Sequence, residues 1–153
     1  RGDSAWHFPQ PELGILLYRG QIIRHTIVYA VPSRPIARAN PLYLPQANIY
    51  DPCCALGPCV TTDVTDPHDL EMSLTVDRDG TTVFEGRTTT SEVVRSCEEL
   101  VSYLTRHNAI PDVSVLLTGT SIIPDEEFSL RVGDTVSADI EGIGILRNPV
   151  TEV

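Results

Sequence analysis

Two pairs of β-rich segments, each pair joined by a tight turn, constrain the fold of this chain most strongly. The first pair is joined across Arg19-Gly20, and the second across Arg78-Asp79-Gly80. Glycine tolerates the positive φ that short hairpin turns require, so each pair is predicted to form an antiparallel β-hairpin. The paired segments are Leu13–Tyr18 with Ile22–Tyr29, and Met72–Asp77 with Thr82–Thr88.

One helix is predicted, over Glu92–Arg106, because apolar residues recur there at the helical period and Thr90 or Ser91 can cap its first turn. The prolines at positions 32, 35 and 41 predict an extended, non-helical excursion after the first hairpin. The remaining strands are predicted at Val113–Leu117, Phe128–Leu130, Thr135–Ile140 and, after a turn at Gly142–Gly144, Ile145–Arg147. This pattern indicates a β-rich α+β chain with one main packed helix.

Length and charge narrow the possible functions. At 153 residues, with 41% hydrophobic residues, the chain is predicted to form a single domain over residues 1–153. The formal charge of −10 argues against nucleic acid, whose binding depends on Lys and Arg. No segment approaches the roughly 20 apolar residues that a membrane span needs, and no signal-peptide pattern opens the chain. We therefore expect a cytoplasmic protein that binds neither nucleic acid nor membranes.

The cysteines and the first residues offer further motifs. The spacing of Cys53, Cys54, Cys59 and Cys97 matches no common zinc site, so these residues are predicted to be buried free thiols. The chain begins Arg-Gly-Asp-Ser without methionine, which suggests a trimmed chain or a preceding segment. An integrin-binding role for that tripeptide is disfavoured, because the rest of the chain has no extracellular signature.

Several motifs together resemble those of the fumarylacetoacetate hydrolase family. Residues 40–58, NPLYLPQANIYDPCCALGP, resemble the family's LPQAKxYD…CALGP. The segments LTGT (117–120), VGD (132–134) and IEGIGILRNPV (140–150) are similar to its LTGT, PGD and IxGIGxLxNPV. The opening residues 1–6 resemble a segment that follows an amino-terminal domain in many members. The resemblance implies the carboxy-terminal catalytic half of such a protein, folded as a mixed β-sandwich roll.

The resemblance also implies where a divalent metal would bind. The family carries a Glu-x-Glu pair in PEPEL, an Asp in GNDxSSRxI and a Lys in LPQAK. This chain has Gln10 and Glu12 at the pair, Ala30 at the Asp position and Asn48 at the Lys position. One carboxylate holds a hydrated magnesium ion weakly. We therefore expect a degenerate metal site and no resident cofactor, and leave open a weak magnesium ion completed by substrate oxygens and water.

The residues expected to line the site follow from the same motifs. Glu12 is predicted as the acid, base or hydrogen-bond acceptor, although a structural pairing of Glu12 with Arg34 is an equal alternative. Tyr29 and Gln10 are predicted as catalytic hydrogen-bond donors. At least one of Tyr43 and Tyr50 fits a core role equally well, and Thr120 fits a turn-shaping role. The predicted substrate-binding residues are Arg34, Tyr43, Asn48, Tyr50 and Thr120.

Three functions remain open at this point. The leading interpretation is a metal-independent enzyme of specialised, polyketide-like metabolism, a cyclase, cycloaddition catalyst or isomerase that acts by positioning its substrate. The alternative is a metal-dependent lyase, dehydratase or hydrolase of a 2-oxo acid or acyl-pyruvate, with a weak or shifted metal site. The third is a non-catalytic partner subunit. A small-molecule substrate and a homodimer are expected.

Overall fold

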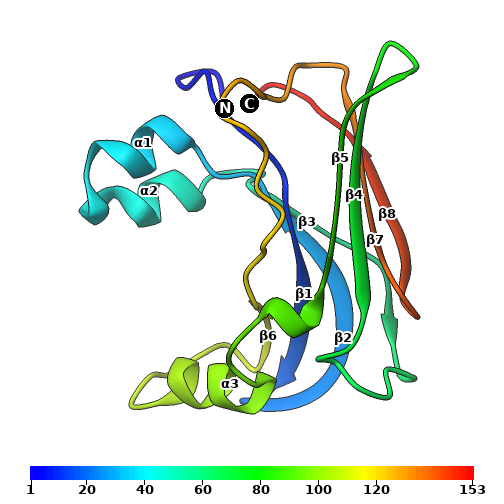
Figure 1. The fold of residues 1–153 in the computed structure, drawn as a ribbon. Coiled ribbons are helices and arrows are strands. Elements are labelled where there is room, and N and C mark those ends of the chain that lie inside the picture. Colours follow the sequence, from blue (N-terminus) through cyan, green and yellow to red (C-terminus); the bar gives the residue numbers. More distant parts are fainter.

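Two four-stranded sheets pack face to face in the computed structural model, which describes residues 1–153 (Figure 1). Their strand orders are β3-β2-β1-β6 and β5-β4-β7-β8, and neighbouring strands are antiparallel. The strands are β1 (Gln10–Tyr18), β2 (Gln21–Ala30), β3 (Cys54–Thr61), β4 (Glu71–Arg78), β5 (Thr81–Thr89), β6 (Val113–Leu117), β7 (Thr135–Ile140) and β8 (Gly144–Pro149). The predicted β-rich α+β class is confirmed.

The hydrophobic core lies between the two sheets. Because side chains alternate along a strand, β1 sends Leu13, Ile15 and Leu17 to the core, and β4 sends Leu74 and Val76 from the other side. β3 lies against β8, where a Cβ built on Gly57 would be 3.3 Å from Cδ1 of Leu146. The two sheets therefore close together along this edge.

The segment after β2 is helical, so the prediction of an extended excursion is wrong. It folds into α1 (Arg34–Ala39), the 3-10 helix η1 (Pro41–Tyr43) and α2 (Leu44–Asn48), here called the helical arm. A proline occupies the first turn of each of these helices. Its fixed φ suits that position, where no N–H is needed, so these prolines begin helices rather than prevent them. The arm projects from the sandwich (Figure 1).

The remaining differences concern helix ends and weak strands. The main helix is α3 (Cys97–Thr105), preceded by the 3-10 helix η2 (Thr90–Glu92). Its cap is Ser96, whose Oγ accepts from the N–H of Glu99 at 3.1 Å, and Val94 is 99% exposed. Residues 128–130 form no strand, and β3 was not predicted. The sequence of β3, CALGPCVT, has few of the residues that favour strands.

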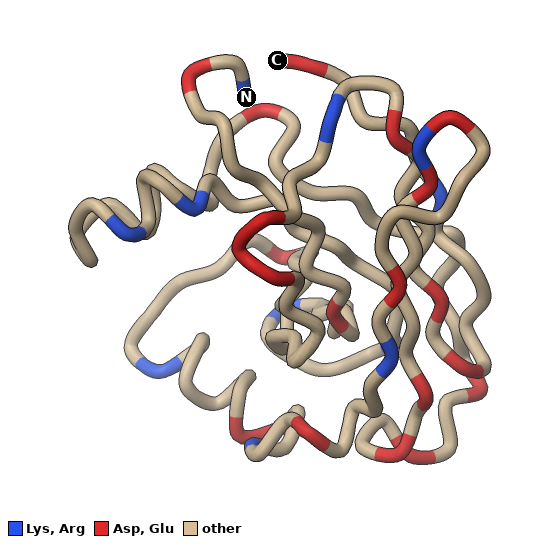
Figure 2. Tube along the Cα trace, turned by 45° about the horizontal axis from the view of Figure 1, so that its top comes forward, with Lys and Arg blue, Asp and Glu red and all other residues tan.

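Charged and thiol groups are distributed unevenly. Arginines lie singly along the chain, whereas acidic residues recur on the turns and strands of the second sheet (Figure 2). No helix is both long and apolar enough to cross a membrane.

Only Cys97 is buried, while Cys54 and Cys59 are exposed and Cys53 is half-buried, so the prediction of four buried thiols is wrong.

A buried ion pair ties β4 to the turn before β7. Asp134 is 1% exposed and accepts from Nε and Nη2 of Arg78, both at 2.8 Å, and from the N–H of Arg131 at 2.8 Å. Burial alone would raise the pKa of Asp134, but the hydrogen bonds from Arg78 and Arg131 outweigh it and lower the pKa. The pair therefore stabilises the fold above the usual Asp range, and the stabilisation is lost as the pH falls through the lowered pKa.

We predict that Asp134→Ala destabilises the protein by about 3–5 kcal/mol at neutral pH, because it leaves Arg78 without its partner. Urea unfolding at pH 7 measures this. Glu85→Ala, which removes the exposed partner of Arg87, is the matched control and should cost at most about 1 kcal/mol. Equal losses in the two variants would contradict a special role for the buried pair.

Candidate functional site

The pairing of β1 with β2 brings the predicted metal-site positions together. Gln10 lies opposite Ala30, and Glu12 lies opposite Val28. Alternate residues of a strand share a face, and directly paired residues share it too. Gln10, Glu12 and Ala30 therefore occupy one face of the first sheet, as the resemblance implied.

Glu12 is buried and held by the loop after β6. It is 7% exposed, and its Oε2 accepts a hydrogen bond from the N–H of Gly119 at 2.5 Å. Next to it, Oγ1 of Thr118 donates to the carbonyl of Leu13 at 3.0 Å. Gly119 has φ +99°, a conformation that suits glycine, and this directs its N–H at the carboxyl group. The LTGT motif thus fixes Glu12 through its backbone.

The environment of Glu12 suits acid–base chemistry. Burial raises the pKa of the Glu12 carboxyl group, and the hydrogen bond from Gly119 lowers it by less. A raised pKa brings a carboxyl group nearer to neutral pH, where it can both accept and donate a proton. Perturbed carboxyl groups of this kind are typical of catalytic sites.

A cleft of about 290 Å³ opens beside this loop. Its wall includes Gly119 and Thr120, Met72 of β4 and Leu100 of α3. Oγ1 of Thr120 accepts from the N–H of Ile122 at 3.2 Å, which is the turn-shaping role considered from the sequence. The loop that holds Glu12 is therefore also a wall of the cleft.

Tyr29 is not brought together with Glu12. It lies opposite Pro11 in the register and belongs to the core between the sheets, on the other face from Glu12. Its hydroxyl group donates to Oδ1 of Asn148 at 3.0 Å. Burial raises the pKa of Tyr29 to about 12, so its hydroxyl group stays protonated at neutral pH.

Arg34 forms no ion pair with Glu12, so that structural alternative is not observed. Its guanidinium group lies over the rings of Phe8, at 4.8 Å, and Trp6, at 5.2 Å. Its Nε is buried and has no hydrogen-bond partner. Arg34 is the first residue of α1, four positions after Ala30 at the end of β2, and its Nε–H is a donor without a partner.

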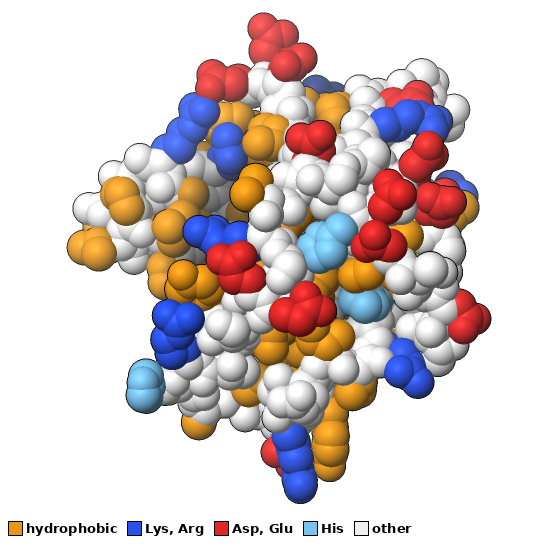
Figure 3. Space-filling model, turned by 60° about the horizontal axis from the view of Figure 1, so that its bottom comes forward, with side chains coloured by type: hydrophobic (Ala, Val, Ile, Leu, Met, Phe, Trp, Pro, Cys, Tyr) orange, Lys and Arg blue, Asp and Glu red, His pale blue; other side chains and the backbone are white.

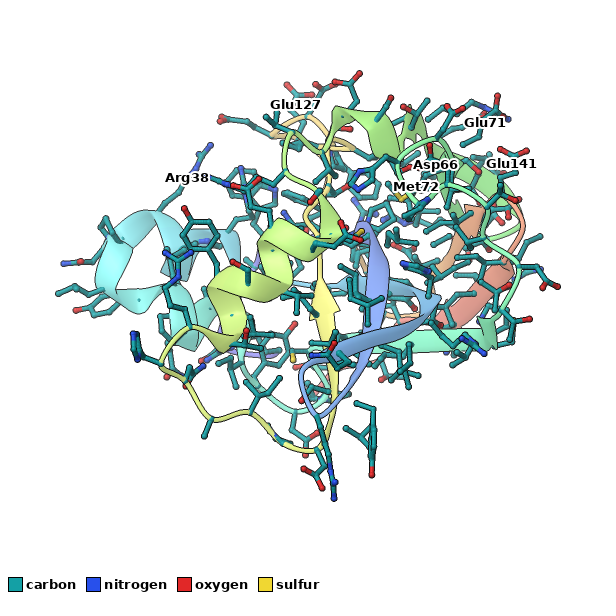
Figure 4. The ribbon with its side chains drawn as sticks, turned by 90° about the horizontal axis from the view of Figure 1, so that it is seen from below. Arg38, Asp66, Glu71, Met72, Glu127 and Glu141 are labelled. Atoms are coloured by element: carbon teal, nitrogen blue, oxygen red, sulfur yellow. The ribbon has the colours of Figure 1, made fainter.

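A second arginine links the helical arm to the loop between β6 and β7. Arg38 lies 4.6 Å from the ring centroid of Trp6 and pairs with Glu126 at 2.6 Å. Figure 4 labels Arg38 and Glu127, the neighbour of Glu126 in this loop. Arg38 thus ties the arm both to Trp6 near the N-terminus and to the loop between β6 and β7.

The other predicted substrate-binding residues lie apart from one another. Tyr43 is 51% exposed on the arm, and Nδ2 of Asn48 donates to the carbonyl of Leu44 in its own helix at 2.7 Å. Tyr50 donates to the carbonyl of Val31 and lines a separate cavity of about 470 Å³ together with Tyr29. The sequence motifs therefore belong to more than one cavity.

The side chains present fit a magnesium ion only in part. Glu12 offers a carboxylate and Gln10 an amide oxygen, but Ala30 offers no donor, and no group of three His, Cys, Asp or Glu side chains is arranged to hold a metal. The labelled carboxylates Asp66, Glu71 and Glu141 lie together at one end of the second sheet, well away from Arg38 (Figure 4).

Comparison with known proteins identifies the class. Residues 21–151 match the model of the fumarylacetoacetate (FAA) hydrolase C-terminal domain. Since this covers most of the chain, the protein belongs to the fumarylacetoacetate hydrolase family, as its motifs predicted.

Particular relatives are dehydratases by name. The chain is 58% identical over its full length to a probable 2-keto-3-deoxyxylonate dehydratase of Haloferax volcanii, of which it covers 54%. It is 42% identical over 98% of its length to a 2-dehydro-3-deoxy-D-arabinonate dehydratase of Saccharolobus solfataricus, of which it covers 51%. A solved 2-keto-3-deoxy-D-arabinonate dehydratase, complexed with magnesium and 2,5-dioxopentanoate, superposes with TM-score 0.93 at 41% identity, covering 96% of this chain and 53% of that one.

These findings correct two predictions. The relatives are dehydratases, so the leading interpretation of a metal-independent cyclase of polyketide-like metabolism is wrong, and the dehydratase alternative is supported. The magnesium complex of a similar structure overturns the expectation of no cofactor. That the protein is an enzyme of the lyase or isomerase type agrees with the relatives. The chain spans about half the length of the relatives it matches.

We predict that Glu12→Gln is at least as stable as the wild type at pH 7, because it removes a buried charge and keeps an acceptor for Gly119. The folded pKa of Glu12 is raised, so the native state binds more protons than the unfolded state above the usual Glu pKa. The free energy of unfolding of the wild type therefore falls as the pH rises from the usual Glu pKa to the raised pKa of folded Glu12. The glutamine variant does not show this decrease.

Urea unfolding of both proteins at pH 4 and pH 7 tests this prediction. The stability of the glutamine variant relative to the wild type should increase between the two pH values. Glu127→Gln, which removes an exposed carboxylate, controls for the change in net charge. A variant that loses stability relative to the wild type at pH 7 would show that the carboxylate of Glu12 is structural.

Proposed function

We propose that this chain is the catalytic part of a dehydratase that acts on five-carbon 2-keto-3-deoxy sugar acids. The observation that carries the proposal is the 58% identity over the whole chain to a probable 2-keto-3-deoxyxylonate dehydratase. The buried carboxyl group of Glu12, with its raised pKa, supplies the acid–base group that such a reaction needs. A small-molecule substrate agrees with the relatives, while the homodimer, the cytoplasmic location and the single domain over residues 1–153 stay predictions.

The substrate chemistry requires one proton acceptor and one proton donor. In a 2-keto-3-deoxy acid, C3 is a methylene group between the C2 carbonyl and the C4 hydroxyl group. Removal of a C3 proton and departure of the C4 hydroxyl group as water leave a C3–C4 double bond. In the proposed step, the Glu12 carboxylate takes the C3 proton and the resulting carboxylic acid protonates the departing hydroxyl group, so one water is lost and Glu12 is regenerated. The resulting enone then loses a proton from C5 and gains one at C3, and the C4–C5 enol formed in this way tautomerises to the C5 aldehyde of 2,5-dioxopentanoate.

Arg34 and Gln10 are the proposed substrate-binding groups. The free Nε–H of Arg34 is a donor for the substrate carboxylate, which arginine binds well. The side-chain amide of Gln10 shares the face of Glu12 and can contact a substrate oxygen. The Gly119 N–H keeps the Glu12 carboxyl group oriented during the reaction. Tyr29 has a supporting role at most in this scheme, because it faces the core between the sheets.

Magnesium is part of the proposal. When bound, it would polarise the 2-oxo group and stabilise the negative charge that follows loss of the C3 proton. The amide oxygen of Gln10 is a hard oxygen donor that this chain would supply to the ion, and the substrate and water would provide the remaining ligands. Glu12 would then stay free to exchange the proton. This corresponds to the weak or shifted site of the sequence-based alternative.

The activity test uses the purified protein with 2-keto-3-deoxy-D-arabinonate in millimolar magnesium. This acid is the same compound as 2-keto-3-deoxy-D-xylonate, because C4 is its only stereocentre. We expect 2,5-dioxopentanoate to form, EDTA to abolish turnover and added magnesium to restore it. Glu12→Gln should lower kcat by about 10²- to 10⁴-fold, because it removes the acid–base group. Glu127→Gln should leave kcat unchanged. A folded protein that does not consume this acid, or a Glu12→Gln variant with wild-type kcat, would contradict the proposal.

We also predict that Gln10→Glu combined with Ala30→Asp lowers the magnesium concentration for half-maximal binding by about tenfold or more, because carboxylates replace an amide and a methyl group. Isothermal calorimetry with magnesium alone measures this without reference to activity. The control, Gln10→Glu with Ala30→Asn, adds an oxygen at position 30 without a charge and should give a smaller gain. Unchanged magnesium affinity in both variants would place the ion away from this face.

A further inference from the structure

A second cavity lies at the end of the sandwich where the first and last residues of the chain meet (Figure 1). Its volume is about 470 Å³, and it shares no wall residue with the cleft beside Gly119. Small-molecule sites in proteins enclose roughly 300–1,000 Å³, so this cavity has room for a ligand. Its wall includes Tyr29 of β2, Ala55 of β3, Val136 of β7 and Asn148 of β8, so both sheets contribute to it.

An amide group with a free donor lines this cavity. The hydroxyl group of Tyr29 donates to Oδ1 of Asn148 at 3.0 Å. Burial raises the pKa of Tyr29 to about 12, so this hydroxyl group keeps its proton and remains the donor. The bond occupies Oδ1 and orients the amide group, whose Nδ2 donates to no group of the protein. Asn148 therefore offers the cavity a hydrogen-bond donor that Tyr29 holds in place.

A buried histidine without a side-chain partner lines the same cavity. His7 is 8% exposed, and its Nε2 is buried and has no hydrogen-bond partner. Its backbone is fixed, because its N–H donates to Oγ of Ser129 at 3.1 Å and its carbonyl accepts from the N–H of Leu130 at 2.9 Å. Burial lowers the pKa of His7, so its ring is neutral at pH 7. A buried polar atom without a partner costs free energy, which a polar group of a ligand would recover.

The charged groups on the wall disfavour an ionic ligand. Arg1 is fully engaged, since Nε and Nη2 donate to Asp3 at 2.6 and 2.7 Å, and Nη1 donates to the carbonyl of Gln46 at 2.8 Å. Glu152 carries the only side-chain carboxylate on the wall, and it is exposed. Neither an anion nor a cation thus finds a buried counter-ion there. More than half of the wall residues are hydrophobic, so the ligand that fits is neutral and has an apolar body.

We propose that this cavity is a second ligand site, which binds a small neutral carbonyl compound, a ketone, aldehyde or amide with an apolar body. The carbonyl oxygen accepts from Nδ2 of Asn148, and the apolar body contacts Ala55 and Val136. A carbonyl group is the matching partner because the free group that Tyr29 fixes is a donor, and a carbonyl oxygen only accepts. The site lies on the other face of the first sheet from Glu12 and is separate from the proposed dehydration.

The experiment uses 2-acetylnaphthalene, a neutral ketone with an apolar ring system, as the probe. Proton–nitrogen correlation spectra of the isotope-labelled protein are the readout. We expect saturable shifts of the side-chain amide signals of Asn148 and of the backbone signals of Ala55 and Val136. Two compounds of similar shape are controls, 2-ethylnaphthalene, which lacks the oxygen, and 2-naphthoate, which carries a charge. Each should bind at least about tenfold more weakly than the ketone.

The matched variants are Asn148→Asp and Asn108→Asp. The first removes the donor but keeps an acceptor for the Tyr29 hydroxyl group, and should weaken ketone binding by about tenfold or more. The second makes the same change at an exposed position outside the wall and should bind the ketone like the wild type. Circular dichroism shows whether each variant is folded.

The proposal is overturned if the ketone causes no saturable shifts around Asn148 in the wild type, or if the shifts lie on the exposed helical arm or in the cleft beside Gly119. A folded Asn148→Asp variant that binds the ketone as tightly as the wild type would also overturn it. Equal affinity for 2-ethylnaphthalene would do the same, because the hydrogen bond would then contribute nothing. The wild-type spectra locate the ligand even if Asn148→Asp does not fold, and no outcome depends on dehydratase activity.

Discussion

The register between β1 and β2 is the constraint on which both the core and the candidate site depend. With Gln10 opposite Ala30 and Glu12 opposite Val28, the alternate residues Leu13 and Tyr29 point to the opposite face and enter the core. A shift by one residue would exchange the two faces, placing a carboxyl group in the core and leucine at the site. The apolar content of these strands therefore fixes the position of the Glu12 carboxyl group.

The hydrogen-bond donors and cations around a buried carboxyl group decide whether its pKa rises or falls. Glu12 receives one backbone hydrogen bond from Gly119 and no cation, so burial dominates and its pKa rises. Asp134 is buried too, but Arg78 and Arg131 surround it with donors and its pKa falls. Asp134 and Glu12 are thus both buried carboxyl groups, but the pKa of the first is lowered and that of the second is raised. The number of hydrogen-bond donors around each carboxyl group accounts for the difference. The arginines of the helical arm, Arg34 and Arg38, stack on aromatic rings instead of neutralising Glu12.

The ligand positions of the family's metal site are only partly kept in this chain. Two of the three positions, Gln10 and Ala30, lack carboxylates, and from the sequence this indicates that no metal ion is bound. A magnesium ion, however, also binds oxygens of the substrate and of water. The number of protein carboxylates therefore affects how tightly the ion binds more than whether it binds. The magnesium complex of a structure 41% identical to this chain, and the dehydratase names of its relatives, therefore outweigh the missing side chains. Leu42, Tyr43 and Leu44 of the arm are exposed. Hydrophobic side chains are visible on the arm, at the left of Figure 3.

The sequence by itself determined the hairpins, the α+β class and the family, because strand alternation, glycine turns and local motifs are encoded over a few residues. Strands β6 and β7 were predicted at their observed limits, and Gln10, Glu12 and Ala30 were correctly expected on one face. Tertiary structure alone decided the rest. Pro35, Pro41 and Pro45 lie in the first turns of helices, and Arg38 of the arm packs on Trp6 from the start of the chain. β3 forms because β2 offers it a pairing edge. Tyr29 faces Asn148 rather than Glu12, and Arg34 stacks on Phe8, because those partners come from distant parts of the chain that only the closed sandwich brings near.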